Sequence, residues 1–230
     1  EGGHDFEFDA LREANNYRRA LLKLFTPYLQ GRVIEIGAGC GQFTEHLRQL
    51  AAIQYLLAVE PSPKFCAEIR KTLPAQPLLE GVITSVSDPA PWNGIVSINV
   101  LEHIPEDQNE LAIYSNLLKK AHGRLCLFVP ARPEIYAPID RDFGHHRRYS
   151  RDDLRQKLEQ AGFRILKLHY FNFIGYFAWW LNFRVMGRRR FNPAMVRLFD
   201  RMIFPVGFRL ESHVARPPIG QSLVAIAEAG

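Results

Sequence analysis

A glycine-rich segment that begins with an acidic residue offers the clearest chemistry in this chain. Residues 35–41 read Glu-Ile-Gly-Ala-Gly-Cys-Gly. The apolar residues Val33, Ile34 and Ile36 predict a buried strand here, and a helix is expected to begin near Gln42. Glycines let the backbone approach a ligand closely, and the start of a helix presents N–H groups. The segment therefore predicts a nucleotide-binding loop.

The spacing of the glycines argues against a dinucleotide ligand. The dinucleotide fingerprint G-x-G-x-x-G would need a glycine at position 42, but this chain has Gln42 and places its third glycine at Gly41. An NAD-dependent oxidoreductase is therefore a disfavoured alternative.

A second acidic residue follows the next predicted strand. Residues 55–59 read as a strand that ends in Glu60, Pro61 and Ser62. In wound sheets an acid at this place can accept both hydroxyls of a ribose, and Glu60 lies about 20 residues past the glycine loop, as that role requires.

Two polar segments further along the chain carry groups that titrate or donate hydrogen bonds. Residues 99–104 read Asn-Val-Leu-Glu-His-Ile, and residues 140–150 read Asp-Arg-Asp-Phe-Gly-His-His-Arg-Arg-Tyr-Ser. His145 and His146 are neighbours, but no further His or Cys stands at zinc-like spacing, so we expect no metal.

These pieces resemble, in the same order, the motifs of class I S-adenosylmethionine (SAM) methyltransferases. The resemblance rests on E-x-G-x-G-x-G, the acid Glu60 and N-V-L-E-H-I, and it covers roughly residues 11–168 and 222–227. The G-H-x-R-R-Y segment is similar to one in a bacterial branch of these enzymes that act on small molecules or lipids. The resemblance implies an α/β, Rossmann-like fold whose seven-stranded sheet has the order 3-2-1-4-5-7-6, with strand 7 antiparallel.

The resemblance also implies a SAM site, with S-adenosylhomocysteine as the product. SAM has no phosphate, so a carboxylate at Glu35 is useful near its cationic methionine end, while Glu60 would bind the ribose. Tyr17 and Arg18, on a leading helix over residues 8–29, would meet the carboxylate of SAM, although Tyr17 also fits simple packing. The expected cofactor contacts are Tyr17, Glu35, Gly37, Ala38, Gly39, Gly41, Glu60, Pro61, Ser62, Val82, Ile83, Asn99, Val100 and Leu101.

Residues of the acceptor site follow from the same resemblance. His103 and His145 are the catalytic candidates, and His145, Arg148 and Tyr149 are candidate acceptor contacts; a structural loop held by Arg–Asp pairs is the alternative. Methyl transfer from a sulfonium is an in-line displacement, so orienting the acceptor can supply most of the rate. A base is needed only if the acceptor must lose a proton.

The remaining elements must hold these residues in place. We expect helices and strands to alternate up to residue 168, with a last strand at residues 222–227. Between the last two strands, residues 170–183 hold eight aromatic residues, and Arg184 and Arg188–190 follow. We expect this insert, at about residues 170–215, to form a cap on a single domain of residues 1–230. Its aromatic and basic residues also suit a membrane interface, a helical subdomain or a dimer contact.

Composition limits the other function classes. The chain has 230 residues, a net charge of +5 and three widely separated cysteines, which suits a reducing cytoplasm. The N-terminus is acidic and polar, so no signal peptide is expected. The absence of a stacking or zinc motif disfavours nucleic acid. We therefore expect a cytoplasmic enzyme with a small-molecule or lipid-like acceptor, at the inner membrane surface if the insert meets lipid. The alternative from another class is a non-catalytic, membrane-associated SAM-binding module.

Overall fold

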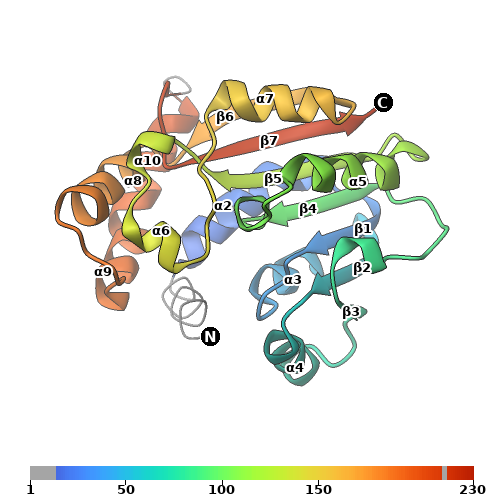
Figure 1. The fold of residues 1–230 in the computed structure, drawn as a ribbon. Coiled ribbons are helices and arrows are strands. Elements are labelled where there is room, and N and C mark those ends of the chain that lie inside the picture. The colour runs from blue at the N-terminus through green and yellow to red at the C-terminus, as the bar shows by residue number, and fades with distance from the viewer. Residues whose placement is uncertain (1–13, 214–216) are drawn as a thin grey trace.

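A single seven-stranded sheet forms the centre of the protein (Figure 1). The structure is a computed structural model that describes residues 14–213 and 217–230. The strand order is β3-β2-β1-β4-β5-β7-β6, and only β7 runs antiparallel to its neighbours. This confirms the expected Rossmann-like sheet. The strands are β1 (Gly31–Ile36), β2 (Ile53–Glu60), β3 (Leu78–Glu80), β4 (Gly94–Ile98), β5 (Arg124–Pro130), β6 (Phe163–Phe171) and β7 (Ser222–Ala229).

Helices cover both faces of this sheet. One face carries α2 (Asn15–Phe25), α3 (Gln42–Leu47) and α4 (Pro63–Thr72), and the other carries α5 (Asp107–Lys119) and α7 (Arg151–Gln160). Short 3-10 turns join these elements: η1 (Thr26–Tyr28), η2 (Ile83–Ser85), η3 (Leu101–His103) and η4 (Pro133–Ile135).

The two-residue period of the strands divides the core into two layers. On β5, Leu125, Leu127 and Val129 face α5 and α7, while Cys126 and Phe128 face α2 and α3. All five side chains are buried, so this strand is covered on both sides, as parallel sheets require. Because β1 to β5 are parallel, their carboxyl ends all lie at one edge of the sheet (Figure 1).

A helical cap, defined here as residues 173–213, lies beyond that edge between β6 and β7. Its pieces are α8 (Phe173–Trp179), the π-helical turn η5 (Trp180–Val185), α9 (Pro193–Leu198), the π-helical turn η6 (Phe199–Ile203) and α10 (Phe204–His213). The last three of these pieces, α9, η6 and α10, follow one another without a break. The first part of the predicted leading helix, residues 8–13, lies outside the described residues.

The segment after β5 contains two prolines and is nevertheless helical. Pro133 begins η4, and Pro138 begins the short helix α6 (Pro138–Asp142). Each proline stands in the first turn of its helix, where its missing N–H has no intrahelical partner to lose.

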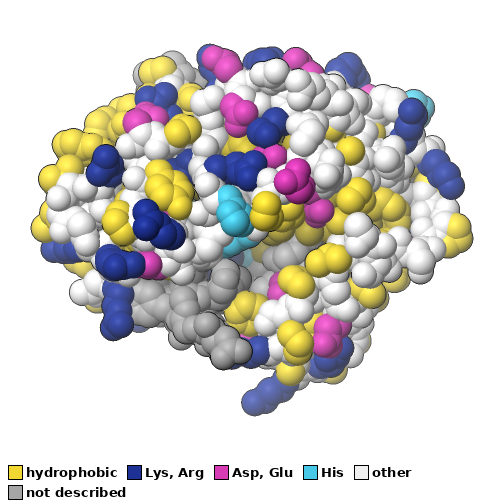
Figure 2. Space-filling view, viewed as in Figure 1, with side chains coloured by type: hydrophobic (Ala, Val, Ile, Leu, Met, Phe, Trp, Pro, Cys, Tyr) yellow, Lys and Arg dark blue, Asp and Glu magenta, His cyan; other side chains and the backbone are white. Residues whose placement is uncertain are grey.

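The cap also exposes an unusual amount of apolar surface. Apart from Val82, the exposed large hydrophobic side chains of the described chain all belong to it: Phe177, Trp180, Leu181, Val185, Met186, Met195, Leu198, Met202, Ile203, Val206 and Leu210. Figure 2 shows such side chains interspersed with Lys and Arg at the left, where Figure 1 places α8 and α9. Nowhere in the described residues is a helix long and apolar enough to cross a bilayer.

A buried carboxylate joins the cap to the leading helix α2 through hydrogen bonds to backbone amides. Residue Ala14 precedes α2 and offers no side-chain cap. Instead the carboxylate of Asp200, from η6, accepts the backbone N–H groups of Asn16 and Tyr17 at 2.9 Å each. Asp200 is buried, and a carboxylate at a helix N-terminus satisfies free N–H groups and complements the helix dipole.

We predict that Asp200→Ala destabilises the protein by about 1–3 kcal/mol, because two N–H groups lose a charged acceptor. Urea unfolding followed by circular dichroism measures the change. The control is Asp152→Ala, which removes an exposed acid from the first turn of α7 and should cost about 0.5 kcal/mol or less. Equal losses in the two variants would contradict this role for Asp200.

Candidate functional site

The glycine loop has a backbone that side chains would obstruct. Gly37 and Gly41 have φ of 68° and 81°, in the left-handed region that favours glycine. A Cβ on Gly37 would lie 2.4 Å from Cγ2 of Val100, so this position also requires close approach between chain segments. The loop is tied back to β2 because the amide of Gly37 donates to the carbonyl of Val59 at 2.8 Å, and the amide of Ala38 donates to the same carbonyl at 3.2 Å.

Glu60 stands at the end of β2, as predicted, and joins two neighbouring segments. Its carboxylate accepts the amide of Gly39 at 2.7 Å and the amide of Ser62 at 2.9 Å. The side chain is buried, so its orientation is fixed by these bonds. The following Pro61 is exposed, and the side chain of Ser62 caps the N-terminus of α4.

Glu35 is a buried acid on β1, on the sheet face that carries α3. Its Oε2 atom has no hydrogen-bond partner within the described part of the chain. Burial raises the pKa of Glu35 from 4.5 to about 8, and the nearby charge of Glu60 adds to the shift. A buried carboxyl in this condition gains from a cationic ligand, because the positive charge stabilises its ionised form.

The predicted contacts on β3 and β4 lie at the same sheet edge. Just after β3, Ile83 is buried and Val82 is exposed, so of these two predicted contacts only Val82 presents its side chain to solvent. Asn99 follows β4 with a left-handed φ of 51°, and its amide donates to the carbonyl of Phe128 at 2.9 Å. Val100 packs over Gly37, whereas Leu101 is fully buried in the core, so only its backbone is available to a ligand.

Asp140 organises the loop that contains the two neighbouring histidines. Its Oδ1 atom accepts Nε of Arg148 at 2.8 Å and lies 3.1 Å from Nδ1 of His145, while Oδ2 accepts the amide of Ala137 at 2.8 Å. Burial would raise the pKa of Asp140, but the hydrogen bonds from His145 and Arg148 outweigh it and hold the pKa below its usual range. Arg148 also lies 4.3 Å above the ring of Trp179, which connects this loop to the cap.

Tyr149 occupies a different position from the other two predicted acceptor contacts. Its ring is fully buried, and its hydroxyl donates to Oδ2 of Asp107 at 2.9 Å and lies 3.2 Å from the carbonyl of Leu101. Burial, followed by the charge of Asp107, raises the pKa of Tyr149. The structure thus brings His145 and Arg148 to the sheet edge and turns Tyr149 into the core.

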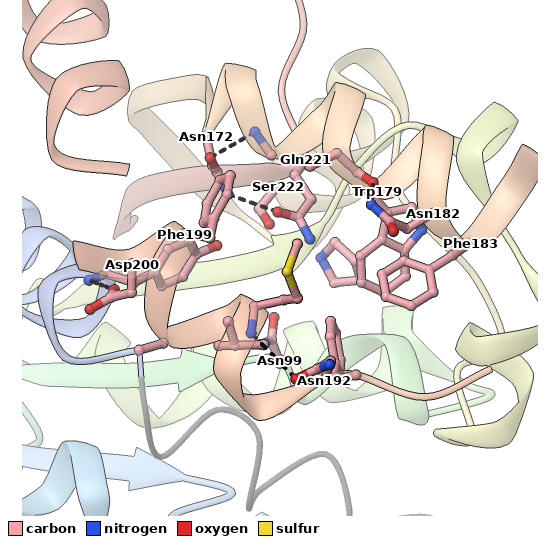
Figure 3. A pocket seen from close by; sticks show the side chains of 18 of the residues that line it. Asn99, Asn172, Trp179, Asn182, Phe183, Asn192, Phe199, Asp200, Gln221 and Ser222 are labelled. Atoms are coloured by element: carbon pink, nitrogen blue, oxygen red, sulfur yellow. Dashed lines mark hydrogen bonds between the residues drawn. The ribbon is translucent and has the colours of Figure 1, made fainter. Parts of the chain in front are cut away.

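A cavity of about 340 Å³ lies between this edge and the cap (Figure 3). Aromatic rings supply much of its wall: Tyr17, Phe128, Phe143, Trp179, Phe183, Phe191 and Phe199. Polar groups converge on it from several elements: Asn99, His145, Arg148, Asn172, Asn182, Arg188, Arg190, Asn192, Asp200, Gln221 and Ser222. A large apolar wall with a few polar groups is the usual character of a small-molecule site.

Several of these polar residues escaped the sequence analysis. The insert between the last two strands contains Asn172, Asn182 and Asp200. Their position among apolar and aromatic residues was the one sequence feature that could have indicated a binding site. Asn172 has a left-handed φ of 61°, caps α8 through the amide of Gly175 at 2.9 Å, and donates to Gln221 at 2.8 Å.

Comparison with known families identifies the general chemistry. A family model described as a methyltransferase domain matches residues 9–168. The chain belongs to this methyltransferase family. The match includes the glycine loop, Glu60 and the segment with Asp140 and His145, which confirms the resemblance to class I SAM-dependent methyltransferases. It leaves the NAD-dependent oxidoreductase without support.

Solved structures of other methyltransferases share the fold. A SAM-dependent methyltransferase from Archaeoglobus fulgidus is 17% identical with a TM-score of 0.60, and the match covers 97% of this chain and 99% of that one. One from Clostridium acetobutylicum is 11% identical with a TM-score of 0.61, covering 94% and 92%. The Burkholderia thailandensis 1,6-didemethyltoxoflavin-N1-methyltransferase, with 1,6-didemethyltoxoflavin and S-adenosylhomocysteine bound, is 17% identical with a TM-score of 0.60, covering 98% and 83%. The search of curated proteins found no match.

The residues of this methyltransferase fit SAM as the methyl donor and S-adenosylhomocysteine as the product. The loop at Gly37 has no room for a Cβ, which keeps its backbone close to the sheet edge. Glu35 offers a buried carboxyl whose ionised form a cationic ligand would stabilise. Glu60 holds its carboxylate at the end of β2, where a ribose binds in wound sheets.

We predict that Glu35→Gln raises the melting temperature of the ligand-free protein at pH 9 by roughly 5–10 °C and leaves it nearly unchanged at pH 5. The folded pKa is about 8 and the ordinary value is 4.5, so the wild-type folded state binds the proton more tightly than the unfolded state. Its stability therefore falls as the pH rises from 4.5 through 8, and the glutamine variant does not share this loss.

Scanning calorimetry from pH 5 to pH 9 measures the difference. The control is Glu45→Gln, an exposed acid on α3, which should give no such trend. A melting-temperature difference between Glu35→Gln and wild type that does not vary with pH would contradict the raised pKa.

Proposed function

We propose that this enzyme transfers the methyl group of SAM to an acceptor with a large apolar part, a small molecule or a lipid, which binds in the cavity under the cap. The observation that carries the proposal is the position of the cavity. Asn99, at the end of β4 beside the glycine loop, is part of its wall, so an acceptor there reaches the place where the family motif puts the methionine part of SAM (Figure 3).

The wall of the cavity supports an apolar acceptor. Six aromatic rings from β5, the loop after α6 and the cap surround it, and Phe143, Trp179 and Phe183 belong to a small apolar cluster separate from the main core. Burying a flat or aliphatic group against such rings gains free energy in proportion to the apolar area removed from water. The cationic side chains of Arg148, Arg188 and Arg190 suit an acceptor that also carries a negatively charged or oxygen-rich group.

The residues of this chain would act mainly by orientation. Glu35 and Glu60 would hold opposite ends of SAM, and the cavity would align the acceptor atom with the sulfonium for in-line displacement. His145 is a titratable group of the cavity wall, and His103 lies beside it with 4.7 Å between ring centroids. Either imidazole could take a proton from an acceptor that must lose one.

A membrane surface is the second element of the proposal, supported by the exposed apolar residues of the cap. The exposed Arg184, Arg197, Arg201 and Arg209 lie on the same helices. Apolar side chains that enter the lipid interface, together with arginines that pair with anionic headgroups, are typical of peripheral membrane proteins. The cap would then take a lipid acceptor directly from the bilayer surface.

We predict that two valine substitutions in the cap separate acceptor binding from membrane binding. Val196 on α9 lines the cavity and is half-buried, whereas Val206 on α10 is 57% exposed and lies outside the cavity wall. Val196→Asp should reduce methyl transfer about tenfold or more, because it places a charge in an apolar site. Val206→Asp should instead weaken vesicle binding about tenfold, because it removes an apolar contact with lipid.

Transfer is measured with methyl-labelled SAM and detergent-solubilised cell extract, which is then separated into organic and aqueous phases. Membrane binding is measured by flotation with phosphatidylglycerol vesicles. Label only in the aqueous phase would refute a lipid acceptor, and equal flotation of wild type and Val206→Asp would refute the membrane contact.

We predict that Glu60→Ala weakens the binding of S-adenosylhomocysteine about tenfold or more, because two ribose hydroxyls lose their acceptor and the amide of Gly39 loses its partner. Isothermal titration calorimetry measures this loss. Glu68→Ala, on helix α4 shortly after Glu60, is the matched control and should bind as wild type does. The cofactor assignment fails if wild type does not bind, or if Glu60→Ala binds equally well.

A further inference from the structure

Three side chains with metal-binding atoms converge at the border of the cavity. Glu102 and His103 come from the turn η3 after β4, and His145 comes from the loop after α6. Their ligand atoms all lie within 4.8 Å of one another. Nε2 of His145 is 3.9 Å from Oε1 of Glu102, and the rings of the two histidines meet edge to face at 86°. Glu102 and His145 are buried and His103 is half-buried.

The two ring nitrogens of His145 face different carboxylates. Its Nδ1 atom lies 3.1 Å from the carboxylate of Asp140. An ionised carboxylate only accepts, so Nδ1 donates to it, and Nε2 faces Oε1 of Glu102 across 3.9 Å. Asp140 is itself fixed by Nε and Nη2 of Arg148, both at 2.8 Å. In metal sites, a histidine commonly binds the metal through one ring nitrogen while a carboxylate accepts a hydrogen bond from the other nitrogen and fixes the orientation of the ring.

We propose that Glu102, His103 and His145 bind a divalent transition-metal ion of the zinc type. Two imidazole nitrogens and one carboxylate oxygen form a ligand set that suits such ions, whereas magnesium and calcium prefer all-oxygen sites. Three protein ligands leave a further coordination position for a ligand or substrate.

Electrostatics and geometry both favour a cation here. A buried carboxylate that faces two imidazole rings is stabilised by a positive charge placed among them. A proton shared between Glu102 and His145 would involve only two of these groups. The ligand atom of the third group, His103, lies close to the same point, as a metal site requires. Zinc–ligand bonds of about 2.1 Å place ligand atoms roughly 3.4 Å apart, so closing the cluster calls for a side-chain movement of about 1 Å.

The proposed ligands are far apart in the sequence, so the spacing of histidines and cysteines along the chain did not indicate a metal site. His145 and His146 are adjacent in sequence, but only His145 enters the cluster, while His146 is exposed and donates its amide to the carbonyl of Glu102 at 2.8 Å. This bond joins the two segments that carry the three ligands. The expectation of no metal considered spacing along the chain and therefore could not include this long-range pairing.

The role of the ion rests on the proposed function. His145 lines the cavity, so an open coordination position beside it would bind an acceptor hydroxyl and lower its pKa. With the imidazoles of His103 and His145 bound to the ion, neither would act as the base, and the hydroxyl proton would leave to solvent. The oxygen would then form its bond to the methyl carbon while the bond from sulfur to that carbon breaks. The products are a methyl ether and S-adenosylhomocysteine, so the cluster points to an oxygen acceptor.

Metal binding is tested directly on tag-free full-length protein treated with a chelator. Titration with Co²⁺, followed by its visible absorption, and with Zn²⁺, followed by calorimetry, should show one site per chain, and Mg²⁺ should not compete. His103→Ala and His145→Ala should weaken Co²⁺ binding about tenfold or more, because each removes one ligand. His146→Ala is the matched control and should bind as wild type does.

Binding of S-adenosylhomocysteine by each variant shows whether it is folded and keeps the two proposals apart. Wild type that binds S-adenosylhomocysteine but no Co²⁺ would overturn the metal site and leave the proposed function intact. So would equal Co²⁺ affinity in wild type and His103→Ala, a variant on a half-buried turn that should fold even if His145→Ala does not. Co²⁺ binding without binding of S-adenosylhomocysteine would keep the metal site and overturn the proposed function.

Discussion

The bond from the amide of Gly39 to the carboxylate of Glu60 connects the ends of two adjacent parallel strands, and the cofactor half of the protein depends on it. A glycine loop has little shape of its own, because glycine loses more conformational freedom on folding than any other residue. The carboxylate fixes one side of the loop, and the close approach of Gly37 to Val100 fixes the other. The sheet edge is thereby organised before a ligand arrives, which lowers the entropy cost of binding.

The acceptor half is built around another buried carboxylate. Asp140 gathers Arg148, His145 and the amide of Ala137, and Arg148 in turn stacks on Trp179 of the cap. A buried charge is tolerated when it is paired and hydrogen bonded, and the contacts to Asp140 meet that condition. The same contacts that stabilise the fold therefore also fix the ring of His145 at the cavity wall.

The sequence predicted the sheet and the cofactor loop well because their signals are local. The spacing of Gly37, Gly39 and Gly41 and the acid at Glu60 each follow from one strand and the turn after it. Methyltransferase family membership and the strand order confirm this part of the analysis. The individual contact residues stay predictions.

Long-range contacts could not be read from the chain in the same way. Nothing near Ala14 indicates that α2 is capped by Asp200, and nothing near His103 indicates that His145 lies beside it. Tyr149 shows the limit most clearly, because a loop sequence does not tell which of its side chains turns inward. It was expected beside Arg148 in the acceptor site, yet its hydroxyl is bonded to Asp107 inside the core.

The attachment of α2 to η6 has a consequence for how the cavity can exchange its contents. Asp200 lies in the cavity wall and at the same time holds the first turn of α2. A displacement of η6 away from α2 would break those bonds and expose two amides and a carboxylate to solvent. Entry of an acceptor by that route would be coupled to fraying of the first turn of α2, and re-forming the bonds after entry would return the same free energy.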